Sequence, residues 1–315
     1  MNGTHPVIEV SGLSMAYGEN LVLDSIDLTV NRGEVVVLLG PNGAGKTTTI
    51  EILEGFRQRS SGSVSVLGTD PQRATEAWRA RVGIVLQSWR DHAKWKVREL
   101  IDVLGSHYTP FSTPEIRRPW NTESLLTTVG LQDHMDARVS TLSGGQRRRL
   151  DVAAGLVGRP ELLFLDEPTA GFDPIARRDF HDLILSLADL DTTILMTTHD
   201  LDEAAKVADR ILILADSRIV ADGSVEDLRR REFGTAEVRW SDGETRHLHS
   251  AEDPTAFLRG MLADPNARVE DLEIRRASLE DVYIALVNKA EGITSRRQDQ
   301  LLRRLQDSMN EEASA

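Results

Sequence analysis

The chain has 315 residues, of which 40% are hydrophobic and 28% are charged, and its formal net charge is −13. The length suits one large domain plus a small one, or two modest ones, with enough apolar residues for a core. The acidic balance argues against a broad nucleic-acid surface, and the lack of cysteine excludes disulfides and thiolate metal sites. No apolar run approaches the roughly 18 to 20 residues of a membrane-spanning helix, and we expect no signal peptide.

The order of the apolar runs predicts an α/β domain. Between residues 7 and 30, short apolar runs broken by glycine and asparagine indicate antiparallel strands. Three later runs are continuous, β-prone and followed by helical stretches, namely Val35–Leu39, Leu162–Leu165 and Thr193–Met196. This pattern is typical of strands buried on both faces of a parallel sheet, with a ligand at their carboxyl ends. The spacing of apolar residues at about 90–135 predicts an inserted helical subdomain.

We place the end of this first domain at residue 230 and predict a small α+β domain over 231–290. Two strands near 236–240 and 245–249 flank the turn sequence Ser241-Asp242-Gly243-Glu244, which is a strong hairpin signal. A helix near 254–263, a strand near 268–275 and a helix near 278–287 complete the prediction. The charged residues 291–315 predict a helical or disordered tail.

A glycine-rich stretch follows directly on the predicted strand Val35–Leu39 and matches the phosphate-loop pattern G-x-x-x-x-G-K-[S/T]. Glycines let backbone N–H groups approach phosphate oxygens at the positive end of the next helix. Lys46 adds a cation for those oxygens and Thr47 a hydroxyl for Mg²⁺. The predicted ATP-binding residues of this loop are Gly40, Pro41, Asn42, Gly43, Ala44, Gly45, Lys46, Thr47 and Thr48.

The second predicted strand of the sheet ends in two carboxylates, Asp166 and Glu167. Asp166, at the strand tip, can reach the coordination shell of the Mg²⁺ ion through water. Glu167 leaves the strand in another direction and is placed to polarise an attacking water molecule. An ordinary strand with an acidic surface turn is the alternative, which the phosphate loop in the same chain disfavours.

A second anion-binding pattern lies in Leu142-Ser143-Gly144-Gly145-Gln146. Two glycines at a helix start expose backbone N–H groups, and the hydroxyl of Ser143 adds a donor. One chain thus carries two phosphate-binding elements. If each covers half of a γ-phosphate, two chains related head to tail bury two ATP molecules between them.

With this pentapeptide the sequence resembles the ABC ATPase family, in which it is the signature motif and the ATP-sandwich homodimer is the working state. The resemblance covers residues 7 to about 225, and the stretch 277–283 is similar to the closing stretch of ATPase subunits of ABC-2-type exporters, the drug-resistance and nodulation-export class. It implies a phosphate-loop NTPase fold, ATP and Mg²⁺ as ligands, and ATP hydrolysis. It further implies an integral membrane permease as partner and a peripheral location on the cytoplasmic face of the membrane.

The resemblance assigns further roles one residue at a time. Tyr17 stands where the family places an aromatic ring that stacks on adenine, and Gln87 where a glutamine senses metal and nucleotide and faces the transport partner. Asp173 matches the loop that crosses to the other subunit, although Phe172 replaces the common leucine before it. His199 matches the histidine that contacts the γ-phosphate. Ser143, Gly144, Gly145, Gln146 and Asp173 thereby join the predicted ATP site, and Glu167, His199 and Gln87 are the predicted catalytic residues.

Two other functions compete with that of a transporter subunit. A soluble ABC ATPase acting on ribosomes or nucleic acid usually carries paired cassettes, a long coiled coil or zinc-binding cysteines, and this sequence shows none of these patterns. A phosphate-loop GTPase or small-molecule kinase is disfavoured because the guanine-binding pattern N-K-x-D is missing and the signature pentapeptide has no purpose in either. The run Arg147–Arg149 lies on the signature helix of an acidic chain, so we interpret it as a helix face and expect no nucleic-acid partner.

Overall fold

The structure, a computed structural model, describes residues 6–85, 92–169, 171–188, 192–233, 236–243, 245–263, 268–275, 277–290 and 292. By its internal contacts the chain divides into two compact units, Met1–Ile219 and Val220–Ala315. The predicted boundary at residue 230 falls inside helix α8 (Val225–Phe233) and stays a prediction. The predicted tail, apart from residue 292, lies outside the described residues.

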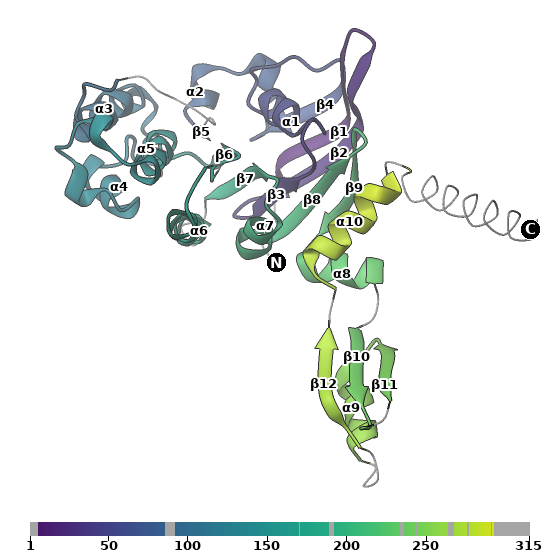
Figure 1. Cartoon of the computed structure of the whole chain (residues 1–315). Coiled ribbons are helices and arrows are strands. Elements are labelled where there is room, and N and C mark those ends of the chain that lie inside the picture. The colour runs from purple at the N-terminus through teal and green to yellow at the C-terminus, as the bar shows by residue number, and fades with distance from the viewer. Residues whose placement is uncertain are drawn as a thin grey trace, which may run out of the picture. The chain divides into compact units, whose positions relative to one another are not determined.

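The parallel strands in the order β5-β6-β7-β3-β8 form the centre of the first unit, and β9, which contains the division at residue 219, completes this six-stranded sheet (Figure 1). Its strands are β5 (Val82–Val85), β6 (Leu162–Asp166), β7 (Thr193–Thr198), β3 (Val35–Leu39), β8 (Arg210–Ala215) and β9 (Arg218–Gly223). The pairs β5–β6, β6–β7, β7–β3 and β3–β8 are parallel, and every residue of β3 and β7 is buried. Burial on both faces explains their continuous apolar sequences and confirms the predicted α/β fold.

A three-stranded antiparallel sheet of order β2-β1-β4 packs on this centre. It consists of β1 (Pro6–Tyr17), β2 (Asn20–Asn31) and β4 (Ser61–Val66), which confirms the strands predicted between residues 7 and 30. Ile8 and Leu23 of this sheet share one hydrophobic core with Leu38 of β3 and Phe164 of β6. The shared core joins the two sheets into one body.

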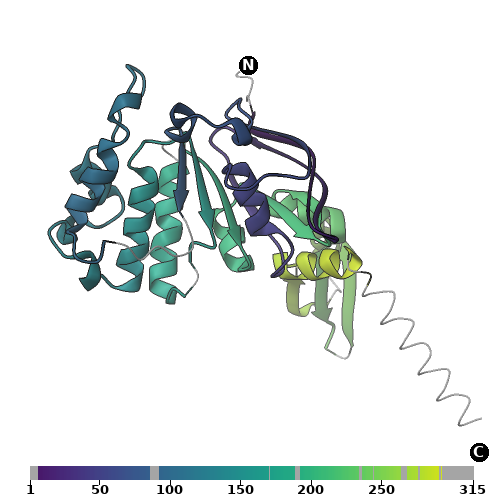
Figure 2. The same ribbon diagram turned by 90° about the horizontal axis from the view of Figure 1, so that it is seen from above.

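Helices of the first unit lie around the parallel sheet, and the described ones are α1 (Lys46–Leu53), α2 (Glu76–Arg79), α3 (Val97–Ser106), α4 (Thr122–Thr128), α5 (Gly144–Leu156), α6 (Pro174–Ala188) and α7 (Leu201–Val207). Helices α3 and α4 occupy the predicted helical insertion, and both pack against α5. Seen from above, the blue and teal helices gather at one end of the sheet, away from the purple antiparallel strands (Figure 2). None of the described helices combines the length and the apolar character that a membrane crossing demands.

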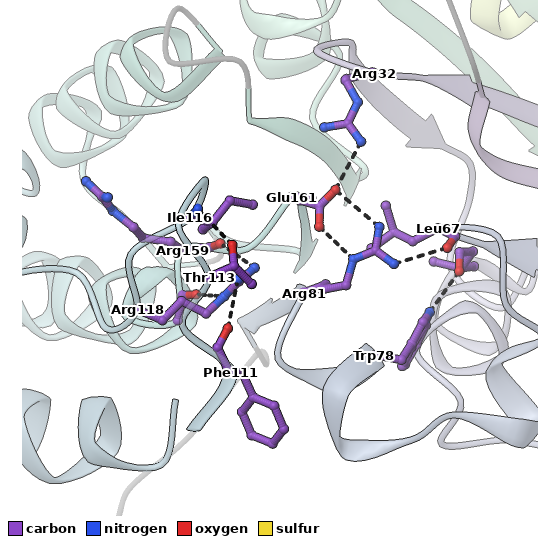
Figure 3. A network of polar contacts seen from close by, with 12 residues as sticks. Arg32, Leu67, Trp78, Arg81, Phe111, Thr113, Ile116, Arg118, Arg159 and Glu161 are labelled. Atoms are coloured by element: carbon purple, nitrogen blue, oxygen red, sulfur yellow. Dashed lines mark hydrogen bonds and ion pairs between the residues drawn. The ribbon is translucent and has the colours of Figure 1, made fainter. Parts of the chain in front are cut away.

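An arginine–glutamate network holds the start of β6 (Figure 3). The carboxylate of Glu161 accepts hydrogen bonds from Arg81 Nε at 2.6 Å and from Arg32 Nη2 at 3.0 Å. Burial pushes the pKa of Glu161 upward, but these two arginines outweigh it and hold the pKa below the ordinary glutamate value. Nearby, Arg118 is buried and donates to the carbonyl oxygen of Gly158 at 2.7 Å. These bonds secure the strand at the end opposite its carboxylates.

The second unit contains a three-stranded antiparallel sheet in which β10 (Ala236–Ser241) lies between β11 (Arg246–Ala251) and β12 (Glu270–Arg275). Helix α9 (Pro254–Leu262) packs on it through Phe257, whose ring lies 4.0 Å from that of His249. Helix α10 (Leu279–Ala290) contacts α8. The hairpin and the helix–strand–helix order predicted for this region are confirmed.

Candidate active site

The loop between β3 and α1 depends on glycine at two positions. Gly45, which caps α1, has φ 106°, and a Cβ atom there would lie 2.6 Å from Leu23 Cδ2. A Cβ atom on Gly40 would lie 2.3 Å from the carbonyl oxygen of Leu214. Gly43 also has a positive φ, 82°, but a Cβ atom there would meet nothing within 4 Å. The loop is therefore pressed against the protein on one side and open at its tip, where its backbone can approach a ligand.

Lys46 is held inside this loop. Its Nζ donates to the carbonyl oxygens of Gly40 at 2.8 Å and Pro41 at 3.2 Å, and it lies 3.8 Å from Glu167 Oε1. The residue is 5% exposed. Burial lowers the pKa of Lys46, and the carboxylates of Glu167 and Asp166 oppose that shift. The ammonium group is thus placed to neutralise phosphate oxygens bound by the loop.

Asp166, at the tip of β6, accepts hydrogen bonds from two threonines. Its Oδ2 accepts from Thr47 Oγ1 at 3.3 Å, and its Oδ1 accepts from Thr197 Oγ1 at 2.5 Å. Thr197 in turn accepts from the backbone N–H of Glu167 at 3.0 Å. The motifs of the sequence assign no role to Thr197. The pair Thr197-Thr198 at the end of a buried strand is the sequence feature that could have indicated one.

Glu167 turns away from β6 with φ 41°, in the left-handed region that costs a non-glycine residue about 1 kcal/mol or more. Its Oε1 atom lies 3.4 Å from Nδ1 of His199, which follows the neighbouring strand β7. The His199 side chain is 59% exposed, and that of Glu167 only 20%. The structure therefore brings Lys46, Glu167 and His199 together at the carboxyl ends of adjacent strands.

The residues around Asp166 fit a Mg²⁺ ion held together with a nucleotide. Thr47 and Asp166 supply hard oxygen donors within hydrogen-bond distance of each other. Within the described part of the chain, no group of three or more histidine, cysteine or acidic side chains could form a complete metal cage. Mg²⁺ suits such a sparse donor set because it keeps several waters and takes further ligands from phosphates.

The signature residues form the start of α5. Ser143 Oγ accepts from the backbone N–H of Gln146 at 3.3 Å, and Gln146 Oε1 accepts from the backbone N–H of Ser143 at 2.9 Å. This capping box fixes the first turn. Ser143 and Gly144 are exposed, and a Cβ atom on Gly145 would lie 3.3 Å from that of Ala176. Helix α5 stands well apart from α1 and its phosphate loop (Figure 1).

Three further predicted residues can be compared with the structure. Asp173 caps α6, because its Oδ1 accepts from the backbone N–H groups of Ile175 and Ala176, each at 2.9 Å. Tyr17 is 42% exposed at the end of β1, and the guanidinium of Arg57 lies 5.1 Å from its ring centroid. Gln87 lies outside the described residues, so its predicted role stays a prediction.

The arginine run on α5 contacts the protein itself. Arg148, 6% exposed, donates from Nε to the carbonyl oxygen of Pro168 at 2.8 Å and thereby ties the signature helix to the loop after Glu167. Arg147 pairs with an aspartate on its own helix at 3.3 Å, and Arg149 with one on α6 at 2.6 Å. The interpretation of Arg147–Arg149 as a solvated helix face is therefore wrong for Arg148, which is buried.

Glu54, at the end of α1, is a buried carboxyl group that the sequence did not single out. It is 6% exposed, and burial raises its pKa to about 8, with smaller contributions from Asp166 and Glu51. The folded protein therefore holds a proton that the unfolded chain releases above the ordinary glutamate pKa of 4.5. Stability should fall as the pH rises from about 4.5 to about 8.

We expect Glu54→Gln to remove that loss, because the amide never ionises. The free energy of unfolding of the variant relative to the wild type should rise by a few kcal/mol between pH 5 and pH 9, since each tenfold change in proton affinity corresponds to about 1.4 kcal/mol. Urea unfolding at both pH values measures it. Glu115→Gln, at an exposed position, is the control and should follow the wild type. The same dependence of the free energy of unfolding on pH in the wild type and in Glu54→Gln would contradict the raised pKa of Glu54.

The fold and the site together define a phosphate-loop ATPase of the ABC type: a parallel sheet carries the loop, the paired carboxylates and the histidine at one edge, and the signature heads a separate helix. A sequence model of the family described as "ABC transporter" matches residues 23–170.

Relatives match over nearly the whole chain. Nod factor export ATP-binding protein I of Ralstonia nicotianae is 39% identical, over 91% of this chain and 95% of that protein. The daunorubicin/doxorubicin resistance ATP-binding protein DrrA of Streptomyces peucetius is 34% identical, over 89% of this chain and 92% of that protein. The chain therefore belongs to the ABC transporter family, as one of its ATP-binding ATPases.

Solved structures agree with this assignment. The ATP-binding cassette of an ABC transporter in its ADP conformation matches with a TM-score of 0.62 and 25% identity, over 71% of this chain and 93% of that one. A nucleotide-free cassette from an ABC transporter matches with a TM-score of 0.61, over 84% of this chain and 97% of that one. At 22% identity the second match supports the fold alone.

Proposed function

We propose that this chain is the ATP-hydrolysing subunit of an ABC-2-type exporter, acting from the cytoplasmic face of the membrane on a separately encoded permease. The names of its relatives support export, since one set is named for Nod factor export and another for daunorubicin resistance. The observation that carries hydrolysis is the cluster of Lys46, Glu167 and His199, with Glu167 Oε1 within 3.8 Å of Lys46 Nζ and 3.4 Å of His199 Nδ1.

In the proposed reaction, the phosphate loop and Lys46 bind the β- and γ-phosphates of ATP. Glu167 accepts a hydrogen bond from a water molecule and orients it toward the γ-phosphorus. A bond forms between the water oxygen and phosphorus as the bond to the β–γ bridging oxygen breaks. The proton of the water passes to the Glu167 carboxylate, and ADP and phosphate are the products.

Two groups complete this step. Thr47 and Asp166 would hold a Mg²⁺ ion, together with Gln87 as the family resemblance implies, and the ion would supply positive charge that neutralises the phosphates. His199 contacts the γ-phosphate and is held beside Glu167, 3.4 Å from its carboxylate.

Separation of the two phosphate-binding elements supports a homodimer. Ser143, which caps α5, is exposed, and α5 stands apart from α1 of the same chain (Figure 1). A second chain related by a two-fold axis would present its signature turn to the first chain's nucleotide. Asp173 caps α6, and Ala176 in the first turn of that helix lies beside Gly145 of the signature, so Asp173 would lie at the same interface. ATP binding would close this dimer, and hydrolysis would open it again.

Co-purification tests the proposed partner. We expect tagged Glu167→Gln protein, held with ATP in native membrane extract, to recover a polytopic membrane protein. Lys46→Ala with the same tag is the matched control and should recover less of it, because it cannot close on ATP. Recovery of ribosomal proteins or DNA, with the membrane fraction empty, would instead favour a soluble ABC ATPase.

A further inference from the structure

Both neighbours of His199 in the chain are hydrogen-bonded to each other and to a buried glutamate. The backbone N–H of Asp200 donates to Thr198 Oγ1 at 3.0 Å, and that hydroxyl donates to Glu203 Oε2 at 2.5 Å. The backbone N–H of Glu203 donates back to Asp200 Oδ1 at 3.1 Å. These bonds join the residues on either side of His199, whose own side chain is 59% exposed.

Helix α6 holds the same segment from the other side. Arg177 Nη1 donates to Asp200 Oδ2 at 2.5 Å, and His181 Nε2 lies 3.5 Å from Glu203 Oε1. Arg177 and His181 are four residues apart, so they lie on one face of α6. The helix begins at the turn that Asp173 caps. A continuous set of contacts therefore runs from the loop of Asp173 to the loop of His199.

The pair of His181 and Glu203 is costly to bury. Glu203 is fully buried and His181 is 4% exposed. Neither Glu203 Oε1 nor His181 Nε2 has a hydrogen-bond partner among the described residues, although the two atoms face each other. Apolar side chains of similar volume would join two helices at least as stably. The other carboxylate oxygen, Glu203 Oε2, accepts from Thr198 Oγ1, and this buried hydrogen bond fixes the position of the loop that carries His199.

We propose that Glu203 and His181 are positioning residues that fasten the His199 loop to α6, so that the distance between His199 and Glu167 depends on the helix that Asp173 begins. This inference rests on the proposed roles of Glu167 and His199. It adds a route by which a contact at Asp173, on the proposed dimer interface, would bear on hydrolysis.

Turnover gives the first test. We expect Glu203→Ala to lower kcat for ATP hydrolysis at least about tenfold with KM for ATP within about twofold, because the phosphate loop is untouched. Glu203→Gln should recover part of the loss, since its amide oxygen still accepts from Thr198. Asp202→Asn neutralises an exposed carboxylate beside Glu203 on α7 and should leave kcat unchanged.

A double-mutant cycle with Thr198 distinguishes loss of positioning from a general loss of structure. The double variant Glu203→Ala/Thr198→Val should hydrolyse ATP no more slowly than the slower single variant, because both changes remove the same hydrogen bond. Additive losses, or a KM that rises in step with the fall in kcat, would overturn the proposal.

Hydrogen exchange gives a readout that does not need turnover. In Glu203→Ala and in Glu203→Gln, amide exchange should become faster at residues 198–201 and at the start of α6, while the phosphate loop exchanges as before. Unchanged exchange there would overturn the proposal even if the protein is an ATPase. Failure of the proposed function would give a different result. The wild type would then not hydrolyse ATP, or Glu167→Gln would hydrolyse it at the wild-type rate, while the exchange result would still stand.

Discussion

Glu167→Gln is expected to lower the rate of ATP hydrolysis by about 100-fold or more while ATP still binds, because the amide cannot accept the proton of the attacking water. The change keeps the size of the side chain and its distance to Lys46 and His199. ATP should then accumulate on the protein and hold the proposed dimer together. Phosphate release measures the rate, and light scattering with and without ATP measures the assembly.

The control for this variant is Glu115→Gln, which makes the same chemical change at an exposed position away from the strand ends. It should hydrolyse ATP at the wild-type rate. Normal turnover by Glu167→Gln would show that another group activates the water. A monomer with ATP bound and no turnover would keep Glu167 as the base and count against the dimer.

Lys46→Ala is expected to weaken ATP binding itself, by about tenfold or more. Its ammonium group lies within the loop at 2.8 Å from the Gly40 carbonyl oxygen, so its loss removes the positive charge that the loop offers to phosphate oxygens. Titration with a fluorescent ATP analogue measures the Kd. The loop carbonyls lose a donor as well, so thermal unfolding of the nucleotide-free protein should be recorded beside it.

Lys96→Ala is the matched control for that variant. Lys96 is 49% exposed in its side chain and pairs with Asp136 at 3.3 Å, an arrangement that contributes little to stability. Its Kd for the analogue should equal that of the wild type. Equal affinity of Lys46→Ala and wild type would contradict the phosphate loop as the nucleotide site.

Much of the site was predictable because its parts are contiguous in the chain. The phosphate loop, the Asp166–Glu167 pair and the signature turn are each short patterns next to a strand or helix that apolar periodicity reveals. The structure confirms those flanking elements at β3, β6 and α5. Local spacing alone was enough to predict these elements, because each pattern is contiguous with the strand or helix beside it.

Contacts between distant residues could not be predicted in this way. Thr197 joins Asp166 to the backbone of Glu167 only because β7 lies beside β6 in the sheet. Glu54 looks like any glutamate near a helix end, yet it is buried with a pKa of about 8. Arg148 belongs to a run that resembles a surface patch, and it is buried beneath the loop after Glu167.

The sequence by itself determined the main elements of the sheet, their order along the chain, and which of them carry the predicted phosphate-binding residues. Hydrophobic periodicity and glycine placement act over a few residues, so they can be recognised in the sequence without knowing the tertiary contacts. Only the tertiary structure decided the strand order β6-β7-β3, which brings Glu167, His199 and Lys46 to one edge. It also decided the burial of Glu203 against His181. Strand order and helix contacts depend on packing between segments far apart in the chain, which local patterns do not encode.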